Sequence, residues 1–177
     1  AKVAKAEGFS LENSSAELVG VLANGSFRDA HSILQKIIAS SSDKKISIEE
    51  VEQITGAPKG ELIAQVIEGL AAGDAEKALN AVNKAVEDNA DMEVFTSLLL
   101  DRVRILLLLR YAPEFGKKLA GDLTDDVADA LEGFAKDTDS KINSETLRKL
   151  IEAATLASRS PVPQIPLELA IMELAAD

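Results

Sequence analysis

Apolar residues recur along the chain at the three- and four-residue spacing of helices that bury one face, and no segment alternates convincingly as a strand would. The first two predicted helices cover residues 15–23 and 26–38. Asn24-Gly25 separates them, because helices commonly end at a left-handed residue of this kind, and Ser26 is suited to cap the second helix. The predicted apolar stripe of the second helix consists of Phe27, Ala30, Leu34, Ile37 and Ile38.

A third helix and a domain boundary follow after a polar loop. The stretch SIEE at 47–50 has the Ser-x-x-Glu form of a capping box, which predicts a short helix ending near Thr55. The stretch TGAPKG at 55–60 then places two glycines and a proline close together. We expect this break to divide the chain into a small domain, 1–57, and a larger domain, 58–177.

The beginning of the larger region is predicted to form a helical hairpin and a long helix. Gly73-Asp74 separates two apolar stripes, which indicates two antiparallel helices. The stripe of the first helix consists of Leu62, Ile63, Val66, Ile67 and Leu70. Residues 92–111 are apolar on most sides, so we expect a central helix that ends before Pro113.

Three further helices complete an all-α fold class. Thr124 is suited to cap one, Asn143 or Ser144 opens another, and Pro166 fits the first turn of a terminal helix that runs to about Ala176. The residues expected to face inward from the first two are Leu123, Val127, Ala130, Leu131, Phe134, Leu147, Leu150, Ile151, Ala154 and Ala157.

Composition narrows the chemistry that this chain can perform. It has 177 residues and a formal net charge of −11, which argues against duplex binding, since that relies on Lys and Arg neutralising phosphates. It has no cysteine, so disulfides, thiolate nucleophiles and thiolate metal sites are excluded. His31 is its single histidine, and no nucleophile-elbow pattern accompanies it. We therefore expect no catalytic residue, no metal site and no direct binding of nucleic acid.

Arg28 is the candidate functional residue, because a cation in the first turn of a helix opposes the helix dipole, at a cost of about 0.3–1 kcal/mol. It shares a predicted outward face with His31, Ser32 and Gln35. One interpretation is that Asp29 or a nearby glutamate offsets the charge. The other is an anion site, since helix N-terminal amides attract phosphate and a guanidinium adds two parallel hydrogen bonds. The chain has no Gly-rich phosphate loop, so other parts of such a site would come from elsewhere.

Long stretches of the chain resemble a known family. EGFSLENSSAELVGVLANGSFRDAHSILQKIIA, residues 7–39, is similar to the lid of the gamma/tau subunits of bacterial DNA polymerase III, which are AAA+ clamp-loader proteins. KISIEEVEQITG at 45–56 resembles the last helix of that lid. Residues 62–110 resemble the first part of the family's collar domain, and SRSPVPQIPLELAIMEL at 158–174 resembles its end. Within that last stretch, Gln164-Ile165-Pro166 replaces the basic residues usual in the family.

The resemblance implies a role for Arg28. The lid pattern is matched in order by Gly25, Ser26, Arg28, Asp29, Ala30, Ser32, Leu34, Gln35 and Ile37. Arg28 then occupies the sensor 2 position, whose arginine reaches the phosphates of ATP held by the preceding P-loop domain. Phe27 stands where the family usually has Leu or Met, and we expect it in the core rather than against the adenine or ribose. We expect His31 to be a solvated helix residue.

The resemblance also implies a lid-plus-collar fragment whose parent couples ATP, with Mg²⁺, to loading of the sliding clamp on primed DNA. The fragment has no P-loop, so we expect it to hold no cofactor and to hydrolyse no ATP. The expected partners are other clamp-loader subunits, bound through the collar, and the sliding clamp and primed DNA, bound by the full assembly. The chain begins without methionine, as a segment cut from a longer protein would.

A rival interpretation is a non-enzymatic, acidic α-helical adaptor that binds protein partners, with the Arg28 pattern coincidental. The helix predicted over 92–111 fits a monomeric core and a ring of subunits equally well. The most apolar window, 97–110, is interrupted by Asp101, Arg102 and Arg104, so we expect no membrane span. Together with the lack of cysteine, this favours a cytoplasmic protein.

Overall fold

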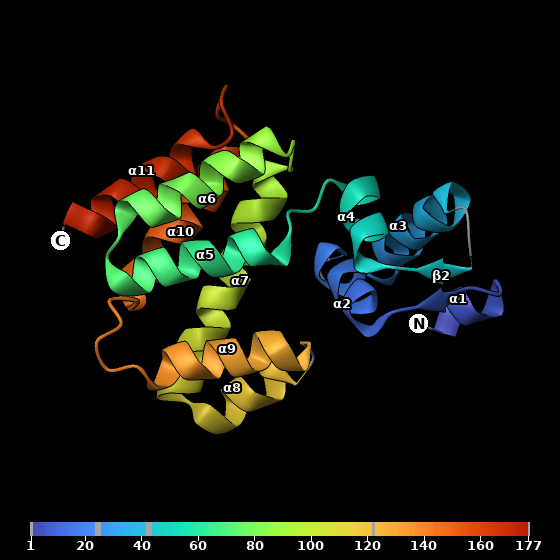
Figure 1. The fold of residues 1–177 in the computed structure, drawn as a ribbon, viewed down its shortest axis with the longest axis horizontal. Helices are drawn as coiled ribbons and strands as arrows, with labels where there is room; N and C mark the ends of the chain where they lie inside the picture. The colour runs from blue at the N-terminus through green and yellow to red at the C-terminus, as the bar shows by residue number, and fades with distance from the viewer. Residues whose placement is uncertain (1, 24–25, 42–43, 122, 177) are drawn as a thin grey trace. The chain divides into compact units, whose positions relative to one another are not determined.

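The structure is a computed structural model that describes residues 2–23, 26–41, 44–121 and 123–176 (Figure 1). The predicted Asn24-Gly25 turn lies outside the described residues. Those residues are almost entirely helical, which confirms the all-α fold class. The chain divides into two compact units, one of Ala1–Ala57 with Asp122–Thr124 and one of Pro58–Gly121 with Asp125–Asp177. Their roles as lid and collar are still predictions at this point.

The described part of the first unit combines four helices with one pair of short parallel strands. They are α1 (Lys2–Ala6), β1 (Ser10–Leu11), α2 (Asn13–Leu22), α3 (Phe27–Ser40), β2 (Lys45–Ile46) and α4 (Ile48–Thr55). The apolar spacing predicts α2, α3 and α4, whereas α1 and the strands are too short to give a periodic signal. The buried Ser15 hydroxyl donates to the Ile46 carbonyl at 3.3 Å and so joins α2 to β2.

Both predicted N-terminal caps in this unit are confirmed. The Ser26 hydroxyl accepts from the Asp29 amide at 3.2 Å. The Ser47 hydroxyl accepts from the Glu50 amide at 3.4 Å, and the Glu50 carboxylate accepts from the Ser47 amide at 3.1 Å, which completes the capping box of α4. Gly56 ends α4 with a φ of 70°, a conformation that glycine adopts without steric cost.

The second unit begins with the predicted helical hairpin, formed by α5 (Gly60–Ala72) and α6 (Ala75–Glu87). Gly73 turns the chain with a φ of 70°, and the Asp74 carboxylate caps α6 by accepting from the Lys77 amide at 3.0 Å. The two helices approach closely at Gly69, where a Cβ would lie 2.8 Å from the Ala78 Cβ. All five residues of the predicted α5 stripe are buried.

The long helix α7 (Met92–Tyr111) is central to this unit, as predicted. Phe95, Leu99, Val103 and Leu106 on it are completely buried. The helices α5 and α10 (Ser144–Ala157) pack on α7, and so do α8 (Pro113–Ala120) and α9 (Asp125–Lys136), which lie together at the lower end of α7 in Figure 1. Pro113 occupies the first turn of α8, where its missing N–H costs nothing.

The terminal hairpin of α10 and α11 (Ile165–Ala176) packs on α7 and α6. Asn143 caps α10, as predicted, by accepting from the amides of Glu145 and Thr146 at 2.8 and 3.3 Å. The expectation that Ile151 faces inward is wrong, because its side chain is 51% exposed. The buried face of α10 is centred on Leu150 and Ala153, and Ile151 lies about 100° around the helix from Leu150.

Ala130 of α9 is likewise exposed rather than inward, and Leu131 is the buried residue of that helix. The apolar stripe of α9 is therefore narrower than the sequence predicts. Among the described residues, no helix is both long enough and apolar enough to cross a membrane.

Candidate functional sites

The start of α3 presents Arg28 to solvent. Arg28 is the second residue of the helix, directly after the Ser26 cap and Phe27. Its side chain is exposed together with those of His31, Ser32 and Gln35, which confirms the predicted outward face. The apolar residues Leu34 and Ile37 of the same helix are buried, so packing of α3 fixes which side Arg28 occupies.

No carboxylate lies within ion-pairing distance of the Arg28 guanidinium in the part of the chain that the structure describes. The contact at Arg28 is a backbone one, in which its carbonyl accepts from the Ser32 hydroxyl at 3.0 Å. Asp29 complements the helix dipole from the first turn without pairing with Arg28. Among the described residues no ion pair neutralises Arg28, and the interpretation that a nearby acid offsets its charge is left with the effect of Asp29 on the helix dipole.

The expectation that Phe27 belongs to the core is wrong, because its side chain is 95% exposed. Phe27 shares a helix face with Leu34, but it is the first residue of α3. Helical side chains tilt toward the N-terminus, so the Phe27 ring projects past the start of the helix rather than onto the core. An aromatic ring and a guanidinium are thus exposed side by side in sequence at one helix end.

A second candidate site is the outer face of α11, which the sequence interpretation missed. Ile165, Leu169 and Met172 recur at i, i+4 and i+7 and are each about half exposed. We call these three residues the α11 stripe. The opposite face of α11 is buried through Leu167 and Ile171, so the helix is apolar on both sides. A helix that is apolar all round is normally covered on all sides, and this feature of IPLELAIMELAA was the signal available in the sequence.

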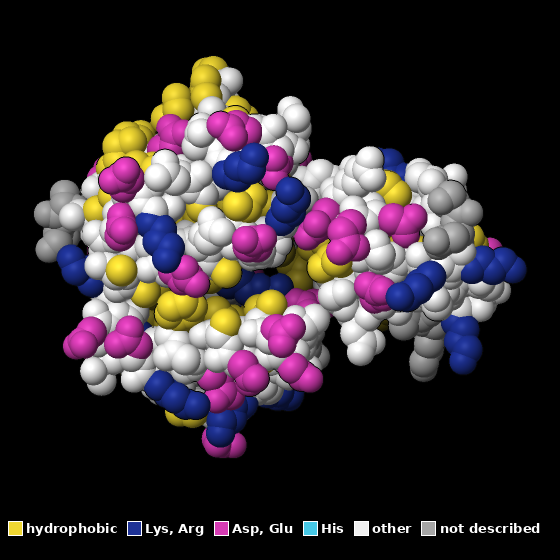
Figure 2. Space-filling model, viewed as in Figure 1, with side chains coloured by type: hydrophobic (Ala, Val, Ile, Leu, Met, Phe, Trp, Pro, Cys, Tyr) yellow, Lys and Arg dark blue, Asp and Glu magenta, His cyan; other side chains and the backbone are white. Residues whose placement is uncertain are grey.

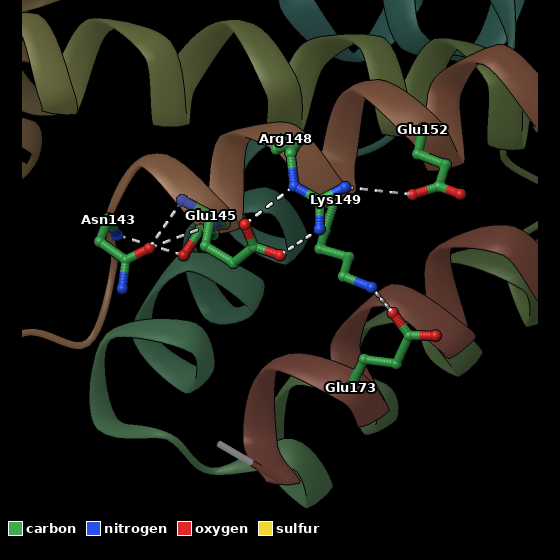
Figure 3. A network of polar contacts seen from close by, with 7 residues as sticks. Asn143, Glu145, Arg148, Lys149, Glu152 and Glu173 are labelled. Carbon is green, nitrogen blue, oxygen red and sulfur yellow. Dashed lines mark hydrogen bonds and ion pairs between the residues drawn. The ribbon is translucent and has the colours of Figure 1, made fainter.

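Charged residues border the α11 stripe on one side. Figure 3 shows Lys149 reaching from α10 to Glu173 of α11, and Arg148 lying between Glu145 and Glu152. The hydrogen bond from Arg148 holds the pKa of Glu145 below its ordinary value. The hydrogen bond to Glu173 raises the pKa of Lys149. The Lys149–Glu173 pair joins α10 to α11, whereas the Arg148 contacts lie within α10.

The surface around the α11 stripe is more apolar than the rest of the face drawn in Figure 2. In Figure 2, apolar side chains gather over the α11 edge of the second unit, whereas acidic and basic side chains are interspersed over much of the remaining face. No continuous basic surface is visible on the face drawn there. Within the described residues, no group of three or more His, Asp or Glu is placed to hold a metal ion.

Comparison with known proteins identifies the family. A model of DNA polymerase III subunits gamma and tau domain III matches residues 46–176. The DNA polymerase III subunit gamma/tau of Mycobacterium tuberculosis is 26% identical over 152 residues, which cover 86% of this chain and 26% of that protein. The DNA polymerase III subunit tau of Bacillus subtilis is 29% identical over 112 residues, which cover 63% of this chain and 20% of that protein. The chain thus spans about a quarter or less of the length of these relatives.

Among solved structures, the DNA clamp loader delta protein of Bacillus subtilis aligns with 99% of this chain and 54% of its own, with a TM-score of 0.49 and 20% identity. The family model covers far more than half of the chain and ends within one residue of its C-terminus. The chain therefore belongs to the family of DNA polymerase III subunits gamma and tau and carries their domain III.

Proposed function

We propose that residues 1–57 act as the nucleotide-sensing lid of a clamp-loader gamma/tau subunit and that 58–177 form its assembly collar. In this proposal the parent protein binds ATP with Mg²⁺ and uses it to load the sliding clamp on primed DNA. The observation that carries the lid assignment is the exposed Arg28, which has no carboxylate partner among the described residues and lies at a capped helix start.

Arg28 fits the phosphates of a nucleotide held by a neighbouring domain. Its planar guanidinium offers paired donors, and the first amides of α3 and the helix dipole favour an anion at the same end. Binding there would offset the cost of placing a cation in the first turn. The exposure of Phe27 supports a second contact, in which its ring lies against the base or ribose of the same nucleotide. The chain itself offers no P-loop, so the lid reports on a nucleotide bound elsewhere.

The test uses the full-length parent protein, in which Arg28→Ala is compared with the wild type. We expect the folded protein to form normally, because Arg28 is exposed, while ATP hydrolysis and clamp loading fall severely. Gln35→Ala, on the same exposed face of α3, is the matched control and should leave both activities unchanged. Near-normal activity of Arg28→Ala would refute the sensing role.

For the collar, we propose that the α11 stripe is covered by an apolar helix of a neighbouring clamp-loader subunit. Membership of the gamma/tau family supports assembly with other clamp-loader subunits, and the stripe is an apolar surface that folding of the second unit leaves uncovered. Leu169→Glu in the parent should reduce assembly with those subunits without unfolding the chain. Ile151→Glu is the control, since Ile151 is equally exposed but lies on α10. Equal loss of assembly in both variants would contradict the assignment.

The adaptor interpretation receives no comparable support, because it requires the resemblance around Arg28 to be coincidental. The adaptor interpretation would become the better supported one if Arg28→Ala and Leu169→Glu both left the activities of the parent unchanged.

A further inference from the structure

The connection between α9 and α10, residues 137–143, is anchored on both of its sides. Toward α5, the Lys141 amide donates to the Ala71 carbonyl at 2.9 Å. The aliphatic part of Lys141 also covers Gly73, where a Cβ would lie 2.7 Å from the Lys141 Cδ. Ile142 is completely buried. Toward α7, the segment is anchored by the Arg110 side chain.

All three nitrogens of the Arg110 guanidinium donate hydrogen bonds to backbone carbonyls. Nη1 donates to the Ile142 carbonyl at 2.6 Å, Nη2 to the Phe134 carbonyl at 3.0 Å, and Nε to the Ala135 carbonyl at 3.2 Å. A fourth, longer contact of 3.5 Å joins Nη2 to the Asp137 carbonyl. One side chain near the end of α7 thus joins the end of α9 to the residue that leads into α10.

The charge of Arg110 is balanced by a helix end rather than by an acid. The guanidinium is half-buried, and none of the carboxylates that the structure describes lies within ion-pairing distance of it. Phe134 and Ala135 belong to the last turn of α9, whose carbonyls have no partner within the helix and carry the negative end of its dipole. The planar fork of arginine suits several carbonyls at once, whereas a lysine ammonium is a single point of charge.

The contacts of Arg110 lie where α9 joins the rest of the second unit. Both α8 and α9 pack on α7, away from the α5–α6 hairpin in Figure 1, and α9 returns to the other helices through residues 137–143. We infer that Arg110 is a positioning residue, a latch that fixes the orientation of α9 against the rest of the second unit. Without it, the last turn of α9 loses these donors, and the end of α9 can move relative to α7 about the 137–143 connection.

The test is hydrogen exchange of this chain with Arg110→Lys, which keeps the charge but removes the fork. Amides in residues 125–143 should exchange at least about tenfold faster, whereas those of α5, α6 and α11 should stay within about twofold of the wild type. Arg104→Lys is the matched control, because Arg104 lies on the same helix but is exposed, and within the described residues its guanidinium pairs with Asp101, at 3.6 Å. Unchanged exchange over 125–143, or an equal increase in every helix, would overturn the inference.

A second measurement needs no variant and so does not depend on Arg110→Lys folding. If a latch holds α9, wild-type amides of 125–143 should exchange in low urea through an opening that costs less free energy than the opening of α7. Exchange of this segment only through global unfolding, together with α7, would contradict the latch.

Discussion

Gly116 of α8 lies directly on the backbone of Leu109 in α7: a Cβ on Gly116 would lie 2.5 Å from the Leu109 amide nitrogen and 2.6 Å from its Cα. Both atoms belong to the backbone of a buried helix and cannot move aside locally. The absence of a side chain at Gly116 therefore sets how closely α8 approaches the central helix of the unit.

Gly116→Ala should lower the free energy of unfolding by about 1–3 kcal/mol, because the new methyl group forces α8 away from α7. Urea unfolding followed by circular dichroism measures the change. Gly133→Ala in α9 is the control, since a Cβ there meets nothing within 4 Å, and it should raise stability by about 0.4–1 kcal/mol. Equal effects of the two substitutions would mean that α8 adjusts freely.

Two leucines of α11 should respond very differently to truncation. Leu167 is completely buried and Leu169 is 52% exposed. Leu167→Ala is expected to cost about 2–5 kcal/mol through lost burial and a cavity, whereas Leu169→Ala should cost less than about 1 kcal/mol. Thermal and urea unfolding of the isolated chain distinguish them. A large loss of stability in Leu169→Ala would show that the α11 stripe is already covered within one chain.

Arg28→Ala should stabilise the isolated chain slightly. It removes a cation from the positive end of the α3 dipole, an interaction worth about 0.3–1 kcal/mol, and breaks no ion pair among the described residues. Lys36→Ala, in the second half of the same helix, is the control and should give no gain. A loss of stability in Arg28→Ala would indicate that Arg28 has a structural role, and the proposed sensing role would lose its support.

Stability should fall in acid through surface carboxylates that are paired in the folded state. Hydrogen bonds from Lys59 and then Lys84 hold the pKa of Asp88 below its ordinary value, and the Lys59 Nζ lies 2.8 Å from Asp88. A carboxyl whose pKa is lowered on folding contributes stability above its unfolded pKa, about 3.9 for Asp, and loses it as the pH falls through the folded value.

Asp88→Asn removes this titration. The difference in unfolding free energy between the wild type and Asp88→Asn should therefore be largest near neutral pH and shrink toward zero as the pH falls below the ordinary Asp pKa and through the lowered folded value. Urea unfolding at a series of pH values measures it. A difference that stays constant with pH would mean that Asp88 has the same pKa in the folded and unfolded chain.

Most of the helices can be predicted from the sequence. The capping box at Ser47, the turn at Gly73 and the long apolar helix over 92–111 each combine a periodic stripe with a strong local signal, and all three are confirmed. The helix α8 is not predicted from the sequence, because it is only eight residues long and includes a glycine. It depends on the close contact of Gly116 with α7, which is a tertiary feature.

The candidate sites were predictable to different degrees. The outward face of Arg28 follows from the spacing of Leu34 and Ile37 around α3. The exposure of Phe27 depends instead on its being the first helical residue, and a one-residue shift of the helix start would change it. The four carbonyls around Arg110 come from residues 24 to 32 positions away in the chain, a separation at which sequence pattern carries no information.

The α11 stripe affects how long an unassembled copy of the protein persists in a cell. Newly made copies that have not met a partner carry an open apolar surface, the feature by which chaperones and proteases distinguish incomplete proteins from finished ones. If the stripe is an assembly surface, an excess of this subunit over its partners would be degraded or would aggregate. The stripe would then mediate contact between subunits and also limit the amount of unassembled subunit. In this way it would keep the amounts of the subunits in proportion.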